Sequence, residues 1–140
     1  MDKVIIDTSA WIESFRPQSE NTFINLVKDL ILKGRILVPG IIKTELLRGT
    51  KTKKEYDRLN DLLKGLEYLS VSDNFWERLS RFSFSLFRKG VTVPLTDTYI
   101  ALLGIENNVS ILHRDKHFDL IAEKVSLKIL ACNEYASKLD

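Results

Sequence analysis

Short apolar runs rich in β-branched residues alternate with longer stretches of helical periodicity along the whole 140-residue chain. The runs predict strands at 3–7, 35–38, 66–70, 109–112 and 127–131. The stretches predict helices at 9–15, 21–33, 41–48, 52–64, 73–89, 97–107 and 116–124. Strands that alternate with helices are typical of βα crossovers. We therefore expect an α/β fold with a mainly parallel sheet of about five strands and helices on both faces.

The length and composition indicate one domain that covers residues 1–140. With 44% hydrophobic residues, the chain can bury a core without disulfides or a structural metal. The single cysteine, Cys132, excludes a disulfide framework and a multi-cysteine zinc site, which favours a reducing, cytoplasmic location. No apolar run approaches the roughly 20 residues that cross a bilayer, so we expect no membrane segment. A net charge of +2 excludes a polycation but allows a local basic surface.

Four carboxylates stand at or near the ends of predicted elements. Asp7 closes the first strand, Asp97 opens a helix, and Asp115 follows the fourth strand. Glu45 lies inside the short helix after the second strand. Because ligands bind at the carboxyl ends of parallel strands, we expect these four side chains to converge there. Hydroxyl side chains flank these acids, and three of them are candidates to hold the carboxylates in place by hydrogen bonds, namely Thr8, Ser9 and Thr96.

Each carboxylate also has a purely structural explanation, as a helix cap, a first-turn acid or a solvated helix residue. Taken together they need more, because crowded carboxylates repel one another unless a cation lies among them. Ligation by oxygen suits Mg²⁺ or Mn²⁺ and not the softer zinc. Such an ion polarises a phosphoryl group and activates water. The set therefore predicts metal-dependent hydrolysis of phosphodiesters.

Four segments carry these acids in order: VIIDTSAWIE (4–13), VPGIIKTELLRG (38–49), PLTDTYIALLGIENN (94–108) and SILHRDKHF (110–118). Their content and order resemble the PIN-domain nucleases. Within that family they resemble the VapC-type toxins of bacterial and archaeal toxin–antitoxin pairs. The resemblance spans nearly the whole chain, and its first and third segments are the most specific.

The resemblance implies a three-layer α/β/α sandwich with a parallel sheet, and endoribonuclease activity that depends on Mg²⁺ or Mn²⁺. It assigns metal binding and catalysis to Asp7, Glu45, Asp97 and Asp115, with Ser9 supporting Asp7. It also implies an RNA substrate, a homodimer, and a cognate antitoxin protein whose C-terminal segment covers the site. One position departs from the family pattern.

That position is His113, which stands where relatives often have threonine. Loss of the threonine hydroxyl affects the support of Asp115, and Asp119 is the alternative fourth acid. The run HRDKH (113–117) also raises a zinc or iron site as a less favoured alternative, because side chains that leave a strand through a turn need not converge.

Basic residues near the acids are candidates for contacts with RNA phosphates. The candidate RNA-binding residues are Arg48, Lys51, Arg114, Lys116 and His117. For the basic stretch 48–58, a solvated helix start is a competing explanation. The aromatic stripe at 75–87 is expected to form core or a dimer surface.

Other function classes lack their motifs. The chain contains no GxxxxGK[ST] phosphate loop, no GxGxxG and no GxSxG, which disfavours nucleotide hydrolysis, dinucleotide redox chemistry and serine hydrolysis. Two alternatives to a toxin nuclease stay open. One is a non-catalytic RNA- or protein-binding module on the same fold, and the other is a non-toxin PIN nuclease in RNA processing.

Overall fold

Seven helices and four strands alternate along residues 2–131, the part of the chain that the computed structural model describes. The strands are β1 (Val4–Ile6), β2 (Ile36–Pro39), β3 (Glu67–Leu69) and β4 (Ser110–Leu112). The helices are α1 (Thr8–Phe15), α2 (Asn21–Leu32), α3 (Gly40–Arg48), α4 (Lys53–Lys64), α5 (Phe75–Arg88), α6 (Leu95–Asn107) and α7 (Lys116–Ala122). Cys132 lies outside the described residues.

The four strands form one parallel sheet in the order β3-β2-β1-β4. The central strand β1 is buried throughout, and its Val4 pairs with Ile36 of β2 and Ser110 of β4. β2 is buried over its whole length as well. Burial on both faces explains why these strands read as continuous apolar runs and not as an alternating pattern.

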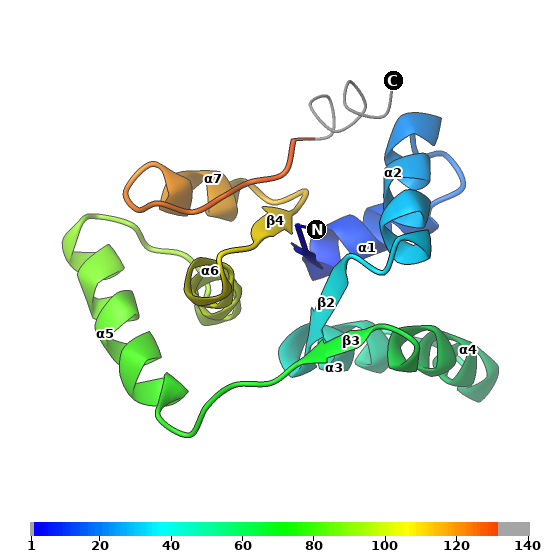
Figure 1. Ribbon diagram of the computed structural model, residues 1–140, viewed down its shortest axis with the longest axis horizontal. Helices are drawn as coiled ribbons and strands as arrows, with labels where there is room; N and C mark the ends of the chain where they lie inside the picture. Colours follow the sequence, from blue (N-terminus) through cyan, green and yellow to red (C-terminus); the bar gives the residue numbers. More distant parts are fainter. Residues whose placement is uncertain (1, 132–140) are drawn as a thin grey trace.

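The order of the strands determines which helices cover which face. The chain moves in one direction from β1 to β2 to β3, so right-handed crossovers put α1–α4 on one face. It returns from β3 to β4 through α5 and α6, which therefore cover the opposite face. Figure 1 shows α1 and α2 on one side of the strands and α5 and α6 on the other. The expected three-layer α/β/α arrangement is confirmed.

Close packing of α6 against β4 depends on Gly104. A Cβ atom at this position would lie 2.9 Å from Cδ1 of Ile111, so a larger residue would push the helix away from the sheet. The absence of a side chain at Gly104 therefore lets α6 lie close to the edge strand β4.

The expected fifth strand at 127–131 is wrong, since the sheet has four strands. This segment makes one isolated parallel bridge, between Ile111 and Ile129. The N–H of Ile111 donates to the carbonyl of Lys128, and the N–H of Leu130 donates to the carbonyl of Ile111, both at 2.9 Å. Pairing that is confined to one residue of β4 does not extend into a ladder. Among residues 2–131, no helix is both long and apolar enough to cross a membrane.

Candidate metal centre

Asp7 follows the central strand directly and caps α1. Its side chain is 4% exposed, and Oδ2 accepts hydrogen bonds from the backbone N–H of Ser9 at 3.1 Å and from its hydroxyl at 2.5 Å. An aspartate is favoured here because its carboxylate satisfies a free amide in the first turn and lies at the positive end of the helix dipole. The local sequence thus places a buried negative charge at the carboxyl end of β1.

Ser9 ties this carboxylate to the loop after β4. Its Oγ accepts a hydrogen bond from the backbone N–H of Arg114 at 3.0 Å. The hydroxyl proton is then available to donate to Asp7. The expected support of Asp7 by Ser9 therefore has a structural counterpart, in a contact that also fixes the segment leading to Asp115.

Three further side chains meet at the first turns of α6 and α7. Asp97 is 8% exposed and lies in the first turn of α6, whereas Asp115 caps α7. Nδ1 of His117 lies 2.8 Å from Oδ2 of Asp97 and 3.0 Å from Oδ1 of Asp115. One potential ligand atom from each of these residues lies within 4.8 Å of the other two.

Burial and the neighbouring acids both change the pKa of the Asp97 carboxyl group. Burial, followed by repulsion from Asp7 and Asp115, raises the pKa of Asp97 from 3.8 to about 6, and the hydrogen bond with His117 offsets part of this rise. Repulsion from Asp7 and Asp115 means that three of the four expected carboxylates are close enough to interact.

A divalent cation fits these residues. Within residues 2–131, the one basic side chain paired with Asp97 or Asp115 is that of His117. The pKa of Asp97 is raised mainly by burial and further by repulsion from Asp7 and Asp115, and a bound cation would relieve that repulsion. Carboxylate oxygens beside an imidazole nitrogen form a donor set suited to divalent ions.

The fourth expected acid, Glu45, approaches from α3. Its Oε1 accepts a hydrogen bond from the hydroxyl of Thr8 at 3.0 Å. Thr8 is the residue directly after Asp7 in the chain. Thr96 precedes Asp97 in the first turn of α6 and is half-buried. Glu45 thus reaches the loop that carries Asp7, although it is not one of the three residues whose ligand atoms cluster.

The histidine that departs from the family pattern supports Asp115 through the backbone. Nδ1 of His113 accepts a hydrogen bond from the N–H of Asp115 at 3.0 Å. Its Nε2 lies 3.3 Å from Oδ1 of Asp119, and its ring packs 5.1 Å from that of Phe118. Asp119 is therefore a partner of His113 and stands apart from the clustered acids.

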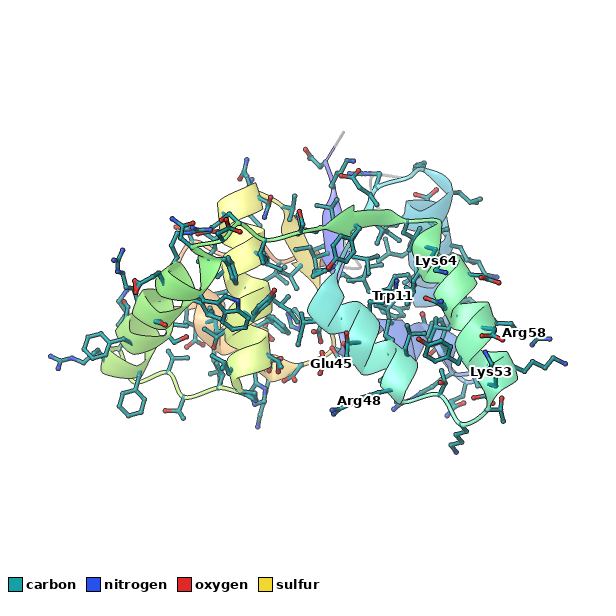
Figure 2. All side chains as sticks on the ribbon, turned by 90° about the horizontal axis from the view of Figure 1, so that it is seen from below. Trp11, Glu45, Arg48, Lys53, Arg58 and Lys64 are labelled. Atoms are coloured by element: carbon teal, nitrogen blue, oxygen red, sulfur yellow. The ribbon has the colours of Figure 1, made fainter. Side chains whose placement is uncertain are left out.

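The basic candidates occupy two places. Arg114 and Lys116 flank Asp115 and are exposed, and the guanidinium of Arg114 lies 4.1 Å from the ring centre of Phe23. Arg48 ends the same helix as Glu45, as Figure 2 shows. Lys51 is exposed before α4, and Lys53 is paired with Asp57.

The sequence favours an RNA contact for His117 and gives its place beside metal-binding acids only as part of the less favoured zinc or iron site at 113–117. A usable signal exists in its spacing. An aspartate that caps a helix accepts from the amide two residues later, as Oδ1 of Asp115 does from the N–H of His117 at 3.0 Å. The side chain at that second position therefore begins close to the capping carboxylate.

The chain is similar to known proteins over most of its length. A sequence model of the PIN domain matches residues 4–124. The chain belongs to the PIN-domain family. It is 33% identical over 128 residues to Ribonuclease VapC11 of Mycobacterium tuberculosis, an alignment that covers 89% of this chain and 96% of that protein. The expected resemblance to VapC-type PIN domains is confirmed.

Solved structures of toxin–antitoxin complexes share the fold. VapBC-1 from nontypeable Haemophilus influenzae superposes with a TM-score of 0.74 at 17% identity, over 93% of this chain and 98% of that one. VapBC2 from Rickettsia felis, bound to a DNA fragment from its promoter, gives 0.73 at 18% identity, over 91% and 96%. Likeness at these identities establishes the PIN-like fold.

Proposed function

We propose that this chain is a metal-dependent endoribonuclease and the toxin of a toxin–antitoxin pair. The observation that carries the proposal is the meeting of Asp97, Asp115 and His117, with Asp7 close enough to raise the pKa of Asp97. The chain is similar over most of its length to proteins named as VapC ribonucleases, which supports RNA as the substrate. Action on cellular RNA implies a cytoplasmic location.

Four carboxylates would hold Mg²⁺ or Mn²⁺, namely Asp7, Glu45, Asp97 and Asp115. A bound divalent cation supplies the positive charge that polarises a phosphodiester and makes water more acidic. The protein's own part is to fix the ligands before substrate arrives. Ser9 orients Asp7, and Thr8 orients Glu45. Capping fixes Asp115.

Basic side chains beside this centre would hold the RNA backbone. Arg114 and Lys116 lie next to Asp115 in the chain, and Arg48 is one helical turn beyond Glu45. All three are exposed, as Lys51 is. A ring of positive charge around an acidic centre attracts phosphate while leaving the cation to the carboxylates. These contacts would weaken steeply as the salt concentration rises.

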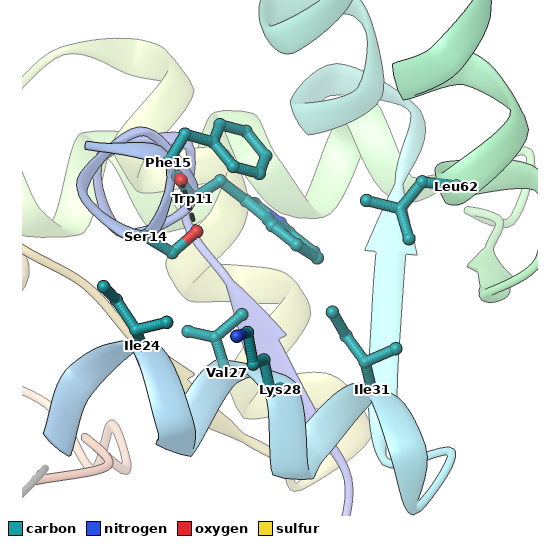
Figure 3. A pocket seen from close by; sticks show the side chains of 8 residues that line it. All are labelled: Trp11, Ser14, Phe15, Ile24, Val27, Lys28, Ile31 and Leu62. Atoms are coloured by element: carbon teal, nitrogen blue, oxygen red, sulfur yellow. Dashed lines mark hydrogen bonds between the residues drawn. The ribbon is translucent and has the colours of Figure 1, made fainter. Parts of the chain in front are cut away.

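The antitoxin would lie in an apolar pocket between α1, α2 and α4. The pocket measures about 180 Å³, and Figure 3 shows the side chains that line it. They are Trp11, Ser14, Phe15, Ile24, Val27, Lys28, Ile31 and Leu62. The indole N–H of Trp11 is buried there without a hydrogen-bond partner in the described structure. A second hollow of about 290 Å³ also includes Phe15 and reaches Glu45.

An amphipathic helix from the antitoxin suits this surface, because apolar pockets in a row accept side chains at helical spacing. Its continuation past Phe15 would reach Glu45 and cover the acidic centre. Toxin–antitoxin complexes among the structural neighbours support the choice of partner. Inhibition would then follow from exclusion of RNA.

A homodimer is part of the same proposal. One face of α5 exposes three large aromatic side chains, with Trp76 59%, Phe84 65% and Phe87 67% exposed. Large exposed apolar surfaces are typical of interaction sites. Of the other two aromatic residues of α5, Phe75 is buried in the core and Phe82 packs against it.

The test is incubation of the purified chain with total RNA. We expect cleavage with Mn²⁺ or Mg²⁺ and none when EDTA replaces the metal. We also expect cells that express the chain alone to stop growing, and to recover when the antitoxin is expressed with it. RNA that stays intact under all metal conditions would contradict the proposed activity.

A further inference from the structure

We infer that His117 is a nitrogen ligand of the cation at this centre and makes the site select transition-metal ions over Mg²⁺. The inference rests on the proposed function in one respect, namely that a divalent cation binds among Asp7, Asp97 and Asp115. It concerns an imidazole that the family resemblance does not place among the metal ligands and that the sequence links to a metal only through the less favoured zinc or iron site at 113–117. Mn²⁺ is the probe for the transition-metal class in the tests below.

The separations between donor atoms carry the inference. Nδ1 of His117 lies 2.8 Å from Oδ2 of Asp97 and 3.0 Å from Oδ1 of Asp115. Neighbouring ligands of an octahedral ion with bonds of roughly 2.1–2.2 Å lie about 3 Å apart. The nitrogen therefore already stands at the distance from each oxygen that neighbouring ligands of one ion have, and the two oxygens lie within 4.8 Å of each other.

The backbone holds the imidazole in this place. Oδ1 of Asp115 accepts from the N–H of His117 at 3.0 Å, so the main chain of His117 is fixed relative to that carboxylate. Helix α7 starts at the next residue after Asp115. The side chain of His117 is 30% exposed, which leaves it partly open to an arriving ion. Preorganisation of this kind lowers the cost of binding.

A hydrogen bond explains the same short distances when no ion is present. Nδ1–H then donates to Asp97 and Asp115. Metal binding requires the other tautomer, with the proton on Nε2 and the lone pair of Nδ1 on the ion. The two arrangements use the same atoms in the same places.

Selectivity follows from the nature of the donor. Mg²⁺ demands oxygen ligands and keeps several waters, whereas Mn²⁺ binds oxygen well but also accepts an imidazole nitrogen, and the later first-row metals favour one. A site of carboxylates alone lacks this discrimination. His117 therefore shifts the balance toward transition-metal ions without changing the carboxylates that both classes share.

His113 provides a matched control from the same loop. Its Nε2 faces Asp119 and its Nδ1 accepts from the backbone of Asp115, so neither nitrogen joins the clustered donors. His113→Asn keeps an acceptor for that backbone N–H while removing an imidazole. A histidine effect that arises merely from proximity would appear in both variants.

The test compares Mn²⁺ and Mg²⁺ binding by calorimetry for the wild-type chain, His117→Ala, His117→Asp and His113→Asn. We expect the wild-type chain to bind Mn²⁺ at least about tenfold more tightly than Mg²⁺. His117→Ala should lose most of that preference, and His117→Asp should replace it with oxygen ligation that serves Mg²⁺ equally. His113→Asn should keep the wild-type ratio. An unchanged ratio in His117→Ala would overturn the inference.

Electron spin echo spectroscopy detects nitrogen ligands of Mn²⁺ directly in the wild-type chain, so its main result does not require any variant to fold. We expect coupling to a directly bonded ¹⁴N in the wild-type chain and in His113→Asn, and its loss in His117→Ala. Bound Mn²⁺ without ¹⁴N coupling, or a wild-type chain that binds no Mn²⁺, would overturn the inference. A chain that shows the coupling but leaves RNA intact would contradict the proposed function alone.

Discussion

Oδ2 of Asp97 lies 2.8 Å from Nδ1 of His117, and this contact joins the first turn of α6 to the first turn of α7. Helix α6 comes after β3 and α5 in the chain, whereas α7 comes after β4. The contact therefore joins two segments that follow different strands of the sheet. It brings an acid of the segment 94–108 against a histidine of the segment 110–118. The pKa of Asp97 is nevertheless raised to about 6, which shows that burial outweighs the benefit of the hydrogen bond.

This raised pKa predicts that the site destabilises the metal-free chain. The folded state binds the proton more tightly than the unfolded state, so stability falls as the pH rises from about 4 to about 6 and stays lower above. The difference between 3.8 and about 6 corresponds to at most about 3 kcal/mol. Asp97→Asn removes this penalty and should raise the free energy of unfolding at pH 7.5 by about 1–2 kcal/mol, which is less than the bound because the amide makes a weaker hydrogen bond with His117.

Thermal unfolding in EDTA at pH 5 and at pH 7.5 checks this. The gain from Asp97→Asn should be larger at the higher pH, where the wild-type carboxylate is ionised. A variant that unfolds at a lower temperature than the wild type at pH 7.5 would contradict the account of Asp97.

Metal binding should reverse the penalty and should depend on pH. At a Mn²⁺ concentration one hundred times its dissociation constant, the folded chain gains about 2.7 kcal/mol. The gain should shrink below pH 6, because protonated Asp97 cannot ligate an ion. Differential scanning fluorimetry with and without MnCl₂ at pH 5 and 7.5 measures it.

Asp57→Asn is the control for that titration, because Asp57 is an exposed acid on α4 that pairs with Lys53. It should keep the full Mn²⁺ shift, whereas Asp97→Asn should lose it. An equal shift at both pH values would show that the ion binds elsewhere.

His113 is predicted to replace the family threonine as an acceptor for the backbone of Asp115. His113→Phe fills the same space but leaves that N–H unpaired, which should cost about 1–3 kcal/mol. His113→Asn restores an acceptor and should recover most of the loss. Urea unfolding separates the two variants, and equal losses in both would rule out the hydrogen bond as the cause.

The exposed aromatics of α5 should hold the dimer together. Trp76→Glu combined with Phe87→Glu places charge on both ends of this face and should shift the chain to the monomer mass. Arg81→Glu is the control, since Arg81 lies on the same helix and its side chain is 80% exposed. Analytical ultracentrifugation gives the masses, and a double variant that remains dimeric would place the interface elsewhere.

The elements were predictable where local signals agree. The capping spacing of Thr52 and Glu55 marks the start of α4, and the hydroxyl of Thr52 does accept from the N–H of Glu55. The apolar run at 127–131 has the composition of a strand, yet it pairs at Ile129 alone. Whether an apolar run joins a sheet depends on how far a neighbouring strand extends beside it. The residues of the run itself do not determine this.

The candidate site was predictable in its acids but not in its histidine. Asp7 and Asp115 show that the two explanations weighed for each carboxylate are compatible, because both residues cap helices while interacting with Asp97. The place of His117 depends on how α6 lies against α7, which is a tertiary relationship. The assignment of catalytic roles to these residues stays a prediction.

The most direct measurement is the rate at which an end-labelled RNA is cleaved by Asp7→Asn at saturating Mn²⁺. Asparagine caps a helix as well as aspartate does, so the variant should fold while losing one negative charge at the proposed metal centre. With Asp57→Asn as the control for the substitution, we predict wild-type cleavage for the control and a loss of at least about a hundredfold for Asp7→Asn. A folded Asp7→Asn that cleaves RNA at the wild-type rate would contradict the proposed metal-dependent ribonuclease.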